Sequence, residues 1–172
     1  MQINFYPESN NPKFEKAAIQ YNKIWEKDGK KIIRTIEKVS GLRFGEKVIN
    51  AVTFGGNSVS IPLELKSEVP IKNMKGTLVH ELCHRLIAGN NAHIHYSEDR
   101  YKYFIEYHKP VTLILYDIWI ELYGKDYAAR QIEYEMSSVW KGKAISPYKI
   151  VWVWALGMTK EEKQKKFKKY FK

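Results

Sequence analysis

The sequence predicts an α+β fold in one domain, with a long N-terminal helix, a small sheet that has an edge strand, and a series of later helices. Three observations lead to this prediction. Apolar residues recur at helical spacing over most of the chain. They alternate as in strands in only a few short stretches, all within the first 65 residues. The length of 172 residues suits one domain, and an apolar share of 44% is enough for a packed core.

The first forty residues predict a strand followed by a long helix. Residues 2–5 alternate between polar and apolar, as in a short strand. Pro12 then stands in the first turn of a helix whose apolar residues recur as far as position 39. Gly29 interrupts this pattern, so the segment is either one helix or two helices broken near Gly29. Gly41 supplies the end.

Two further strands are expected at residues 48–54 and 58–65. The segment Gly55-Gly56-Asn57 between them has the composition of a hairpin turn. Pro62 cannot donate a hydrogen bond to a neighbouring strand, which places the strand 58–65 at the edge of the sheet.

The remaining chain predicts five helices. Their ranges are 71–88, 110–123, 126–140, 147–156 and 159–171, with a polar and aromatic connection that runs through residue 107. Pro110 opens the second of these helices, and Thr159 with Glu162 forms a capping box at the start of the last. We expect residues 1–158 to form the domain, and residues 159–172 to be a basic helix that belongs to it or is appended to it.

The composition excludes several classes of protein. The single cysteine, Cys83, cannot form an internal disulfide. No apolar run approaches the roughly 20 residues needed to span a bilayer. The first residues lack the basic and apolar regions of a signal peptide. We therefore expect a cytoplasmic protein with no membrane segment.

Half of the net charge of +10 lies at one end of the chain. Residues 160–172 hold seven lysines and two glutamates, a net charge of +5. Such a segment can contact nucleic acid, but a solvated helix face explains it as well, and we favour the solvated face.

The chemistry of the sequence is concentrated in residues 80–84, which read His-Glu-Leu-Cys-His and match the pattern HExxH. On a helix, His80 and His84 lie on one face, so both imidazoles can reach one metal ion. Glu81 lies about 100° around the helix, beside the metal. Zinc lowers the pKa of its bound water towards ~7, and Glu81 can take the proton as general base so that the hydroxide attacks a carbonyl. We therefore predict Zn²⁺ as cofactor and Glu81 as the catalytic residue of a peptidase.

With this motif the sequence resembles the small zincin metallopeptidases. In those proteins a backing helix, a sheet with an edge strand, an active-site helix and a later helix with the third zinc ligand follow one another. The order of elements over residues 12–123 is similar. The resemblance implies a peptide or protein substrate that pairs with the strand 58–65.

The third zinc ligand lies outside the HExxH motif. The metzincin pattern needs glycine at position 87 and histidine at position 90, where this chain has Ile87 and Asn90, so metzincins are excluded. His108 is the first candidate, because third histidines at about this distance occur in zincins related to SprT-type proteins. Asp117 is the next candidate, because it lies on the later helix where a gluzincin has its third ligand; it could instead support a ligating histidine or form a salt bridge. Glu133 or Glu135, and then His93 or His95, are the remaining candidates.

Two other functions remain open for the same residues. One is a non-catalytic zinc-binding protein in which the metal only stiffens the fold. The other is a nucleic-acid-associated, SprT-like protease, which the lysine-rich segment 160–172 would favour.

Overall fold

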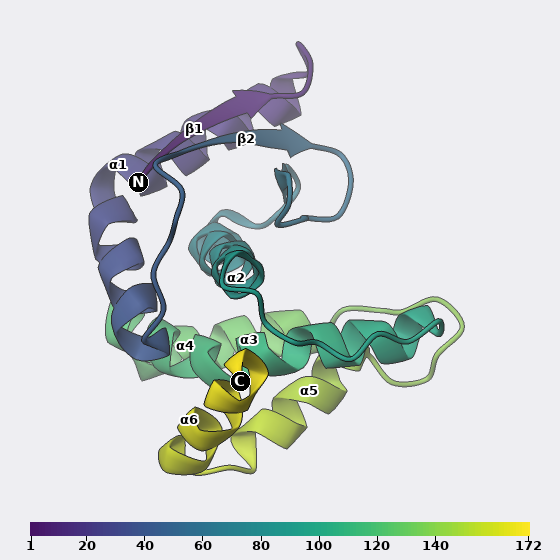
Figure 1. Ribbon diagram of the computed structural model, residues 1–172. Coiled ribbons are helices and arrows are strands. Elements are labelled where there is room, and N and C mark those ends of the chain that lie inside the picture. Colours follow the sequence, from purple (N-terminus) through teal and green to yellow (C-terminus); the bar gives the residue numbers. More distant parts are fainter. The chain divides into compact units, whose positions relative to one another are not determined.

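The computed structural model describes residues 1–172 and confirms the α+β class (Figure 1). The elements are β1 (Gln2–Pro7), α1 (Pro12–Ser40), β2 (Val48–Phe54), β3 (Leu63–Lys66), α2 (Ile71–Gly89), α3 (Arg100–Tyr123), α4 (Lys125–Met136), α5 (Pro147–Leu156), α6 (Lys160–Lys168) and the 3₁₀ helix η1 (Lys169–Phe171). The chain divides into two units, Met1–Gly89 and Asn90–Lys172. The boundary predicted after residue 158 falls inside the second unit and stays a prediction.

The first unit is built on a three-stranded sheet in the order β1-β2-β3. One face of the sheet is apolar, and its rows follow from the register: Ile3 lies beside Ile49, while Phe5, Ala51 and Leu63 form the next row. Side chains on the other face are intermediate or exposed. Because only one face is buried, α1, which contacts β1 and β2, and α2, which contacts β3, both pack on that face.

The hairpin predicted between β2 and β3 is wrong, because these strands are parallel. Two-residue hairpin turns need positive φ angles, and neither Gly55 nor Gly56 has one. Gly56 instead allows a close approach, since a Cβ atom there would lie 2.3 Å from Cε2 of Phe54. The strand β3 spans Leu63–Lys66 rather than the predicted 58–65. Its first residue, Leu63, pairs with Ala51, three residues before the end of β2, so the connection has to return by only ~10 Å along the sheet.

Residues 58–59 cover the outer edge of β3. Val59 and Glu64 exchange two backbone hydrogen bonds of 2.8 Å, and the backbone N–H of Lys66 donates to Oγ of Ser58 at 3.0 Å. The position of β3 at the sheet edge is as predicted. Ser58 and Val59 already bind the outward-facing backbone groups of Glu64 and Lys66, and the expected pairing of a substrate with the strand 58–65 stays a prediction.

The helix α1 runs unbroken for 29 residues, which decides between the two predicted alternatives. The carbonyl of Asn11 accepts from Phe14 and Glu15, its side chain accepts from the N–H of Lys13, and Gly41 ends the helix with φ 74°. Gly29 is tolerated because the ring of Trp25 lies over it, and a Cβ atom there would come within 2.7 Å of that ring.

The second unit is helical, and α3 contacts α4, α5 and α6. Its core includes the fully buried rings of Trp119 and Trp152, whose centroids are 5.6 Å apart. As predicted, α5 follows Ser146 and stops before Gly157, and Thr159 and Glu162 form a capping box on α6.

The predicted start of α3 at Pro110 is wrong by ten residues. The helix begins at Arg100, and the carboxylate of Asp99 accepts hydrogen bonds from the N–H groups of Tyr101 and Lys102, which hold the pKa of Asp99 below its usual value. Ring contacts of Phe104 with Trp140 and Tyr148 add packing to these first turns. Together they offset the roughly 3 kcal/mol that an interior proline costs a helix.

The remaining differences are small. The helix α4 ends at Met136 rather than at residue 140, and a turn with Gly142 at φ 78° follows it. None of the helices combines the length and the apolar character that a membrane-spanning segment needs.

Candidate metal centre

The HExxH segment lies in the middle of α2, and twelve of the nineteen residues of this helix are buried. His80 and His84 are each 3% exposed and Glu81 is 8% exposed. Cys83 is also buried and forms no disulfide. Buried polar groups need partners, so the contacts of His80, Glu81 and His84 decide which chemistry this segment can support.

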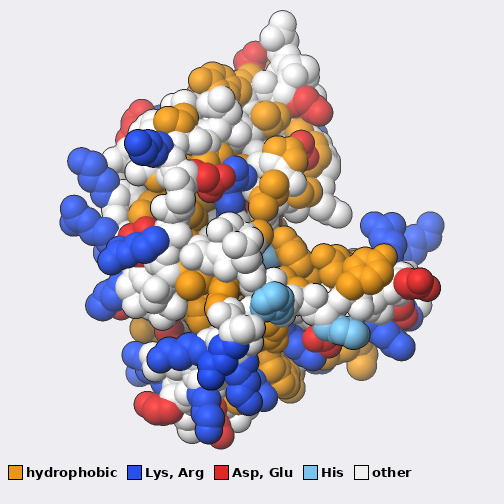
Figure 2. Space-filling model, viewed as in Figure 1, with side chains coloured by type: hydrophobic (Ala, Val, Ile, Leu, Met, Phe, Trp, Pro, Cys, Tyr) orange, Lys and Arg blue, Asp and Glu red, His pale blue; other side chains and the backbone are white.

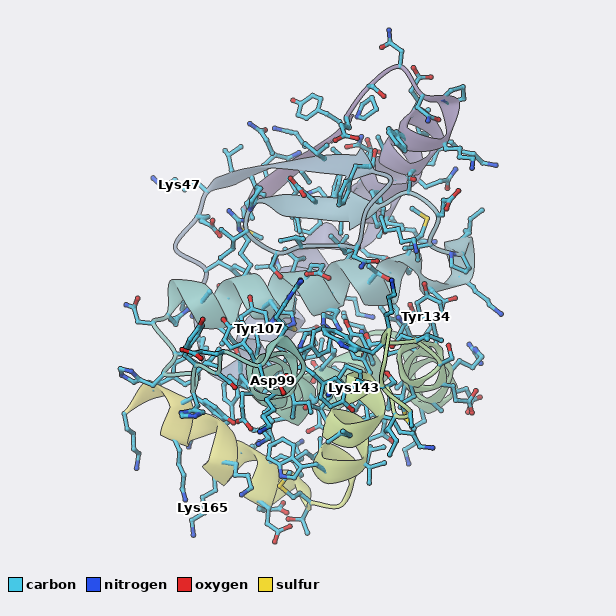
Figure 3. All side chains as sticks on the ribbon, turned by 90° about the vertical axis from the view of Figure 1, so that its right-hand side faces the viewer. Lys47, Asp99, Tyr107, Tyr134, Lys143 and Lys165 are labelled. Carbon is cyan, nitrogen blue, oxygen red and sulfur yellow. The ribbon has the colours of Figure 1, made fainter.

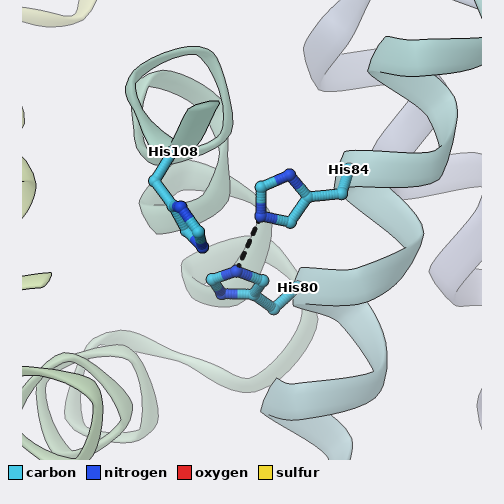
Figure 4. A group of neighbouring side chains, drawn as sticks. All are labelled: His80, His84 and His108. Atoms are coloured by element: carbon cyan, nitrogen blue, oxygen red, sulfur yellow. Dashed lines mark hydrogen bonds between the residues drawn. The ribbon is translucent and has the colours of Figure 1, made fainter. Parts of the chain in front are cut away.

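The imidazoles of His80 and His84 face each other from successive turns of α2 (Figure 4). Their Nε2 atoms are 3.1 Å apart, and the ring centroids are 4.9 Å apart. Two imidazole nitrogens that bind one tetrahedral zinc at 2.0–2.1 Å are separated by about 3.3 Å. The spacing within α2 therefore fits a shared metal ion.

His108 lies on α3 and is 5% exposed. Its Nδ1 is 2.8 Å from the carbonyl oxygen of Phe104. A carbonyl only accepts, so Nδ1 is the donor, and in the neutral ring Nε2 then carries the lone pair. The ring also stacks on Phe104 at 3.8 Å and meets the edge of Tyr148 at 5.0 Å. A backbone acceptor on the second nitrogen is the usual way in which proteins orient a metal-binding histidine.

The three buried histidines His80, His84 and His108 form a group in which each offers one ligand atom, and these atoms all lie within 4.8 Å of one another (Figure 4). Three imidazoles are a donor set that zinc accepts, with a fourth position left for water or substrate. These residues could therefore hold a metal ion.

Glu81 has a partner that the sequence analysis missed. The hydroxyl of Ser60 donates to Oε2 of Glu81 at 2.6 Å, and both side chains are buried. Ser60 lies in the turn before β3, 21 residues before Glu81. No local pattern connects two residues so far apart.

Arg85 follows the motif directly and joins the same group. Its Nη1 donates to the carbonyl oxygen of Ser60 at 2.8 Å, and its Nε lies 2.8 and 2.9 Å from the two carboxylate oxygens of Glu46. The Arg85 side chain is only 15% exposed. An arginine inside a largely buried helix needs an acidic partner, so Arg85 is the residue of the sequence that could have indicated a further charged contact.

The other candidate ligands make other contacts or are exposed. Oδ1 of Asp117 is 3.6 Å from Nζ of Lys163, which is the salt bridge foreseen as its alternative role. Oε2 of Glu135 accepts a hydrogen bond from Nε1 of Trp152 at 2.8 Å. Glu133, His93 and His95 are exposed. None of these five residues belongs to the group of possible metal ligands, which contains the three histidines alone.

Comparisons with known proteins give no further guide to the site. The chain matches no protein-family model, no curated protein and no solved structure.

Proposed function

We propose that the protein is a zinc-dependent peptidase that binds its metal through His80, His84 and His108 and uses Glu81 as general base. The observation that carries the proposal is the buried HExxH segment on α2. It presents two imidazole nitrogens 3.1 Å apart, with a buried carboxylate one residue after the first histidine. The tautomer of His108 supports its choice as third ligand, because its Nδ1 donates to a backbone carbonyl.

Each residue then has one task. Bound zinc supplies a positive charge that polarises a carbonyl group and acidifies water near neutral pH. Glu81 accepts a proton from the attacking water and returns it to the leaving amine. Phe104 keeps the ring of His108 oriented through its carbonyl oxygen. The substrate class that this chemistry serves is a peptide or a protein.

Metal content tests the ligand set. Zinc per chain is measured by atomic emission after dialysis for the wild type, His108→Ala and Asp117→Ala. We expect about one zinc in the wild type and in Asp117→Ala, and a strongly reduced content in His108→Ala. Full zinc in His108→Ala would show that another residue supplies the third ligand.

Hydrolysis of a peptide library tests the reaction. Glu81→Gln keeps the metal ligands and removes the base, so zinc content stays and the rate falls by roughly 10²–10⁴-fold. A Glu81→Gln variant with full activity would contradict the proposed mechanism.

The depth of the site favours one competing function, a metal that only stabilises the fold. His80, His84 and His108 are all at most 5% exposed, as in closed structural sites. That function predicts a zinc-loaded wild type that melts well above the chelated protein and hydrolyses no peptide. Zinc-dependent hydrolysis that Glu81→Gln abolishes excludes it.

A further inference from the structure

We propose that Ser60 is a positioning residue that holds the carboxylate of Glu81 for proton transfer, and that Arg85, braced by Glu46, keeps Ser60 in place. This inference rests on the proposed peptidase function, because it concerns the general base of that reaction. All four residues lie in the unit Met1–Gly89.

The first step of the argument is the contact itself. The Oγ–Oε2 distance of 2.6 Å is that of a charge-assisted hydrogen bond, in which a neutral hydroxyl donates to a carboxylate. Ser60 is 4% exposed, so bulk water competes little for this bond. A glutamate side chain has three rotatable bonds, and a base displaced by 1 Å can lose much of its effect. The Ser60 hydroxyl restricts that freedom at one carboxylate oxygen.

The second step is the attachment of Ser60 to α2. Arg85 lies four residues after Glu81, so both side chains leave the same face of the helix. Glu81 accepts a hydrogen bond from the Ser60 hydroxyl, and Nη1 of Arg85 donates to the carbonyl oxygen of Ser60 at 2.8 Å. Glu46 fixes the guanidinium through contacts of Nε with both carboxylate oxygens. The side chain and the backbone of Ser60 are thus both bound to the helix that carries the base.

The third step is the attachment of the preceding residues to β3. Two backbone hydrogen bonds of 2.8 Å join Val59, the residue directly before Ser60, to Glu64. Ser60 is therefore held on one side by β3 and on the other by α2. A segment fixed from both sides is suited to hold a side chain still, whereas a lid needs one side that can let go.

The test compares Ser60→Ala with a matched control, Ser58→Ala. Both variants remove one hydroxyl from the same turn, but Ser58 contacts Lys66 rather than Glu81. For Ser60→Ala we expect kcat to fall roughly 10-fold, with KM and zinc content unchanged, because the base loses only part of its contribution. Ser58→Ala keeps kcat. In the Glu81→Gln background, Ser60→Ala causes no further loss.

A second measurement is independent of activity. In chelated protein, the melting temperature is measured for Ser60→Ala, for Glu81→Leu, which has no acceptor for the Ser60 hydroxyl, and for the double variant. We expect the double variant to melt about 5 °C higher than the sum of the single shifts predicts, because the bond is lost only once.

The outcomes separate the two proposals. An active wild type with an equally active or more active Ser60→Ala variant overturns the role of Ser60 and leaves the peptidase function intact, and additive melting shifts do the same. Zinc binding without any hydrolysis by the wild type overturns the peptidase function and the role of Ser60 with it.

Discussion

The substitution Asp117→Asn tests whether Asp117 serves a salt bridge or the metal. Its Oδ1 lies 3.6 Å from Nζ of Lys163, whose side chain is 7% exposed, while the Asp117 side chain is 20% exposed. The ammonium group also lies 5.2 Å from the ring centroid of Tyr116. Asparagine keeps the size of the side chain and removes its charge, so a buried ammonium group loses its carboxylate partner.

The magnitude follows from these distances. Two charges 3.6 Å apart interact by roughly 4–5 kcal/mol at an effective dielectric constant of 20. Partial exposure of Asp117 and the remaining contact with Tyr116 reduce the net loss, which we put at about 2–3 kcal/mol. For a chain of this size, 1 kcal/mol moves the melting temperature by about 2–4 °C. Asp117→Asn should therefore lower the melting temperature by about 5–10 °C.

Circular dichroism melts of the chelated protein measure the shift, and atomic emission measures zinc in the same samples. The matched control is Asp117→Asn combined with Lys163→Met, which removes the buried charge and should recover most of the loss. A melting temperature equal to that of the wild type would refute the role of the salt bridge. Loss of zinc would show that Asp117 acts on the metal site instead.

Three further outcomes concern the second unit. Thr159→Ala removes the capping box with Glu162 and should cost about 1 kcal/mol, seen as a melting temperature lower by about 2–4 °C; an unchanged melt would contradict the cap. Burial, with the nearby charge of Glu106, raises the pKa of Tyr170 to about 12. An unfolded tyrosine titrates near 10, so the stability from Tyr170 is complete below about pH 10 and is lost as the pH rises towards 12, by at most roughly 2 kcal/mol after allowance for partial exposure. Urea midpoints at pH 9 and 11 should therefore differ less in Tyr170→Phe than in the wild type, and an equal difference would refute this assignment. The protein should not bind a labelled DNA duplex at 0.15 M salt through the lysines of residues 160–172. Binding that weakens steeply with salt would instead support the nucleic-acid-associated protease.

The last of these predictions rests on the arrangement of charge in α6. Lys and Arg side chains gather over this helix, and Lys165 extends away from it (Figures 2 and 3). Glu161 and Glu162 stand in the first turn and three lysines in the last, which is the order that the helix dipole favours. Lys163 is buried against Asp117 and is not available to a partner. Helix stability thus accounts for much of the basic segment.

The helices could be predicted where their ends are coded by neighbouring residues. Pro147 and Gly157 bracket α5, and the capping box starts α6. Where a tertiary contact determines the end of a helix, the prediction from sequence was wrong. Pro110 concealed the earlier start of α3 at Arg100, because the packing that offsets an interior proline comes from residues about 40 positions away.

The direction of β3 was hidden for a similar reason. Gly55 and Gly56 have the composition of a hairpin turn, yet Gly56 serves the close approach of the Phe54 ring. A glycine indicates either that a neighbouring group approaches the backbone closely or that the backbone has an unusual φ angle, and the sequence alone does not distinguish the two.

The candidate site divides in the same way. His80, Glu81 and His84 lie within one helical turn and were recognisable from their spacing, and the choice of His108 came from a resemblance. Ser60 and Glu46 were not foreseen, because they reach Glu81 and Arg85 across 21 and 39 residues of sequence. Long-range polar contacts leave no periodic pattern in a sequence.

The parallel sheet of the first unit also has a consequence for the order of folding. Gln2 pairs with Val48, so the partner strand of β1 follows the whole of α1 in the sequence. A hairpin could have formed early and locally, but this sheet requires closure of a loop of more than 40 residues. A 29-residue helix forms in about a microsecond and turns most of that loop into a rod of roughly 43 Å. We therefore expect α1 to form first, the strands to assemble along it, and the HExxH helix to dock only when β3 is in place.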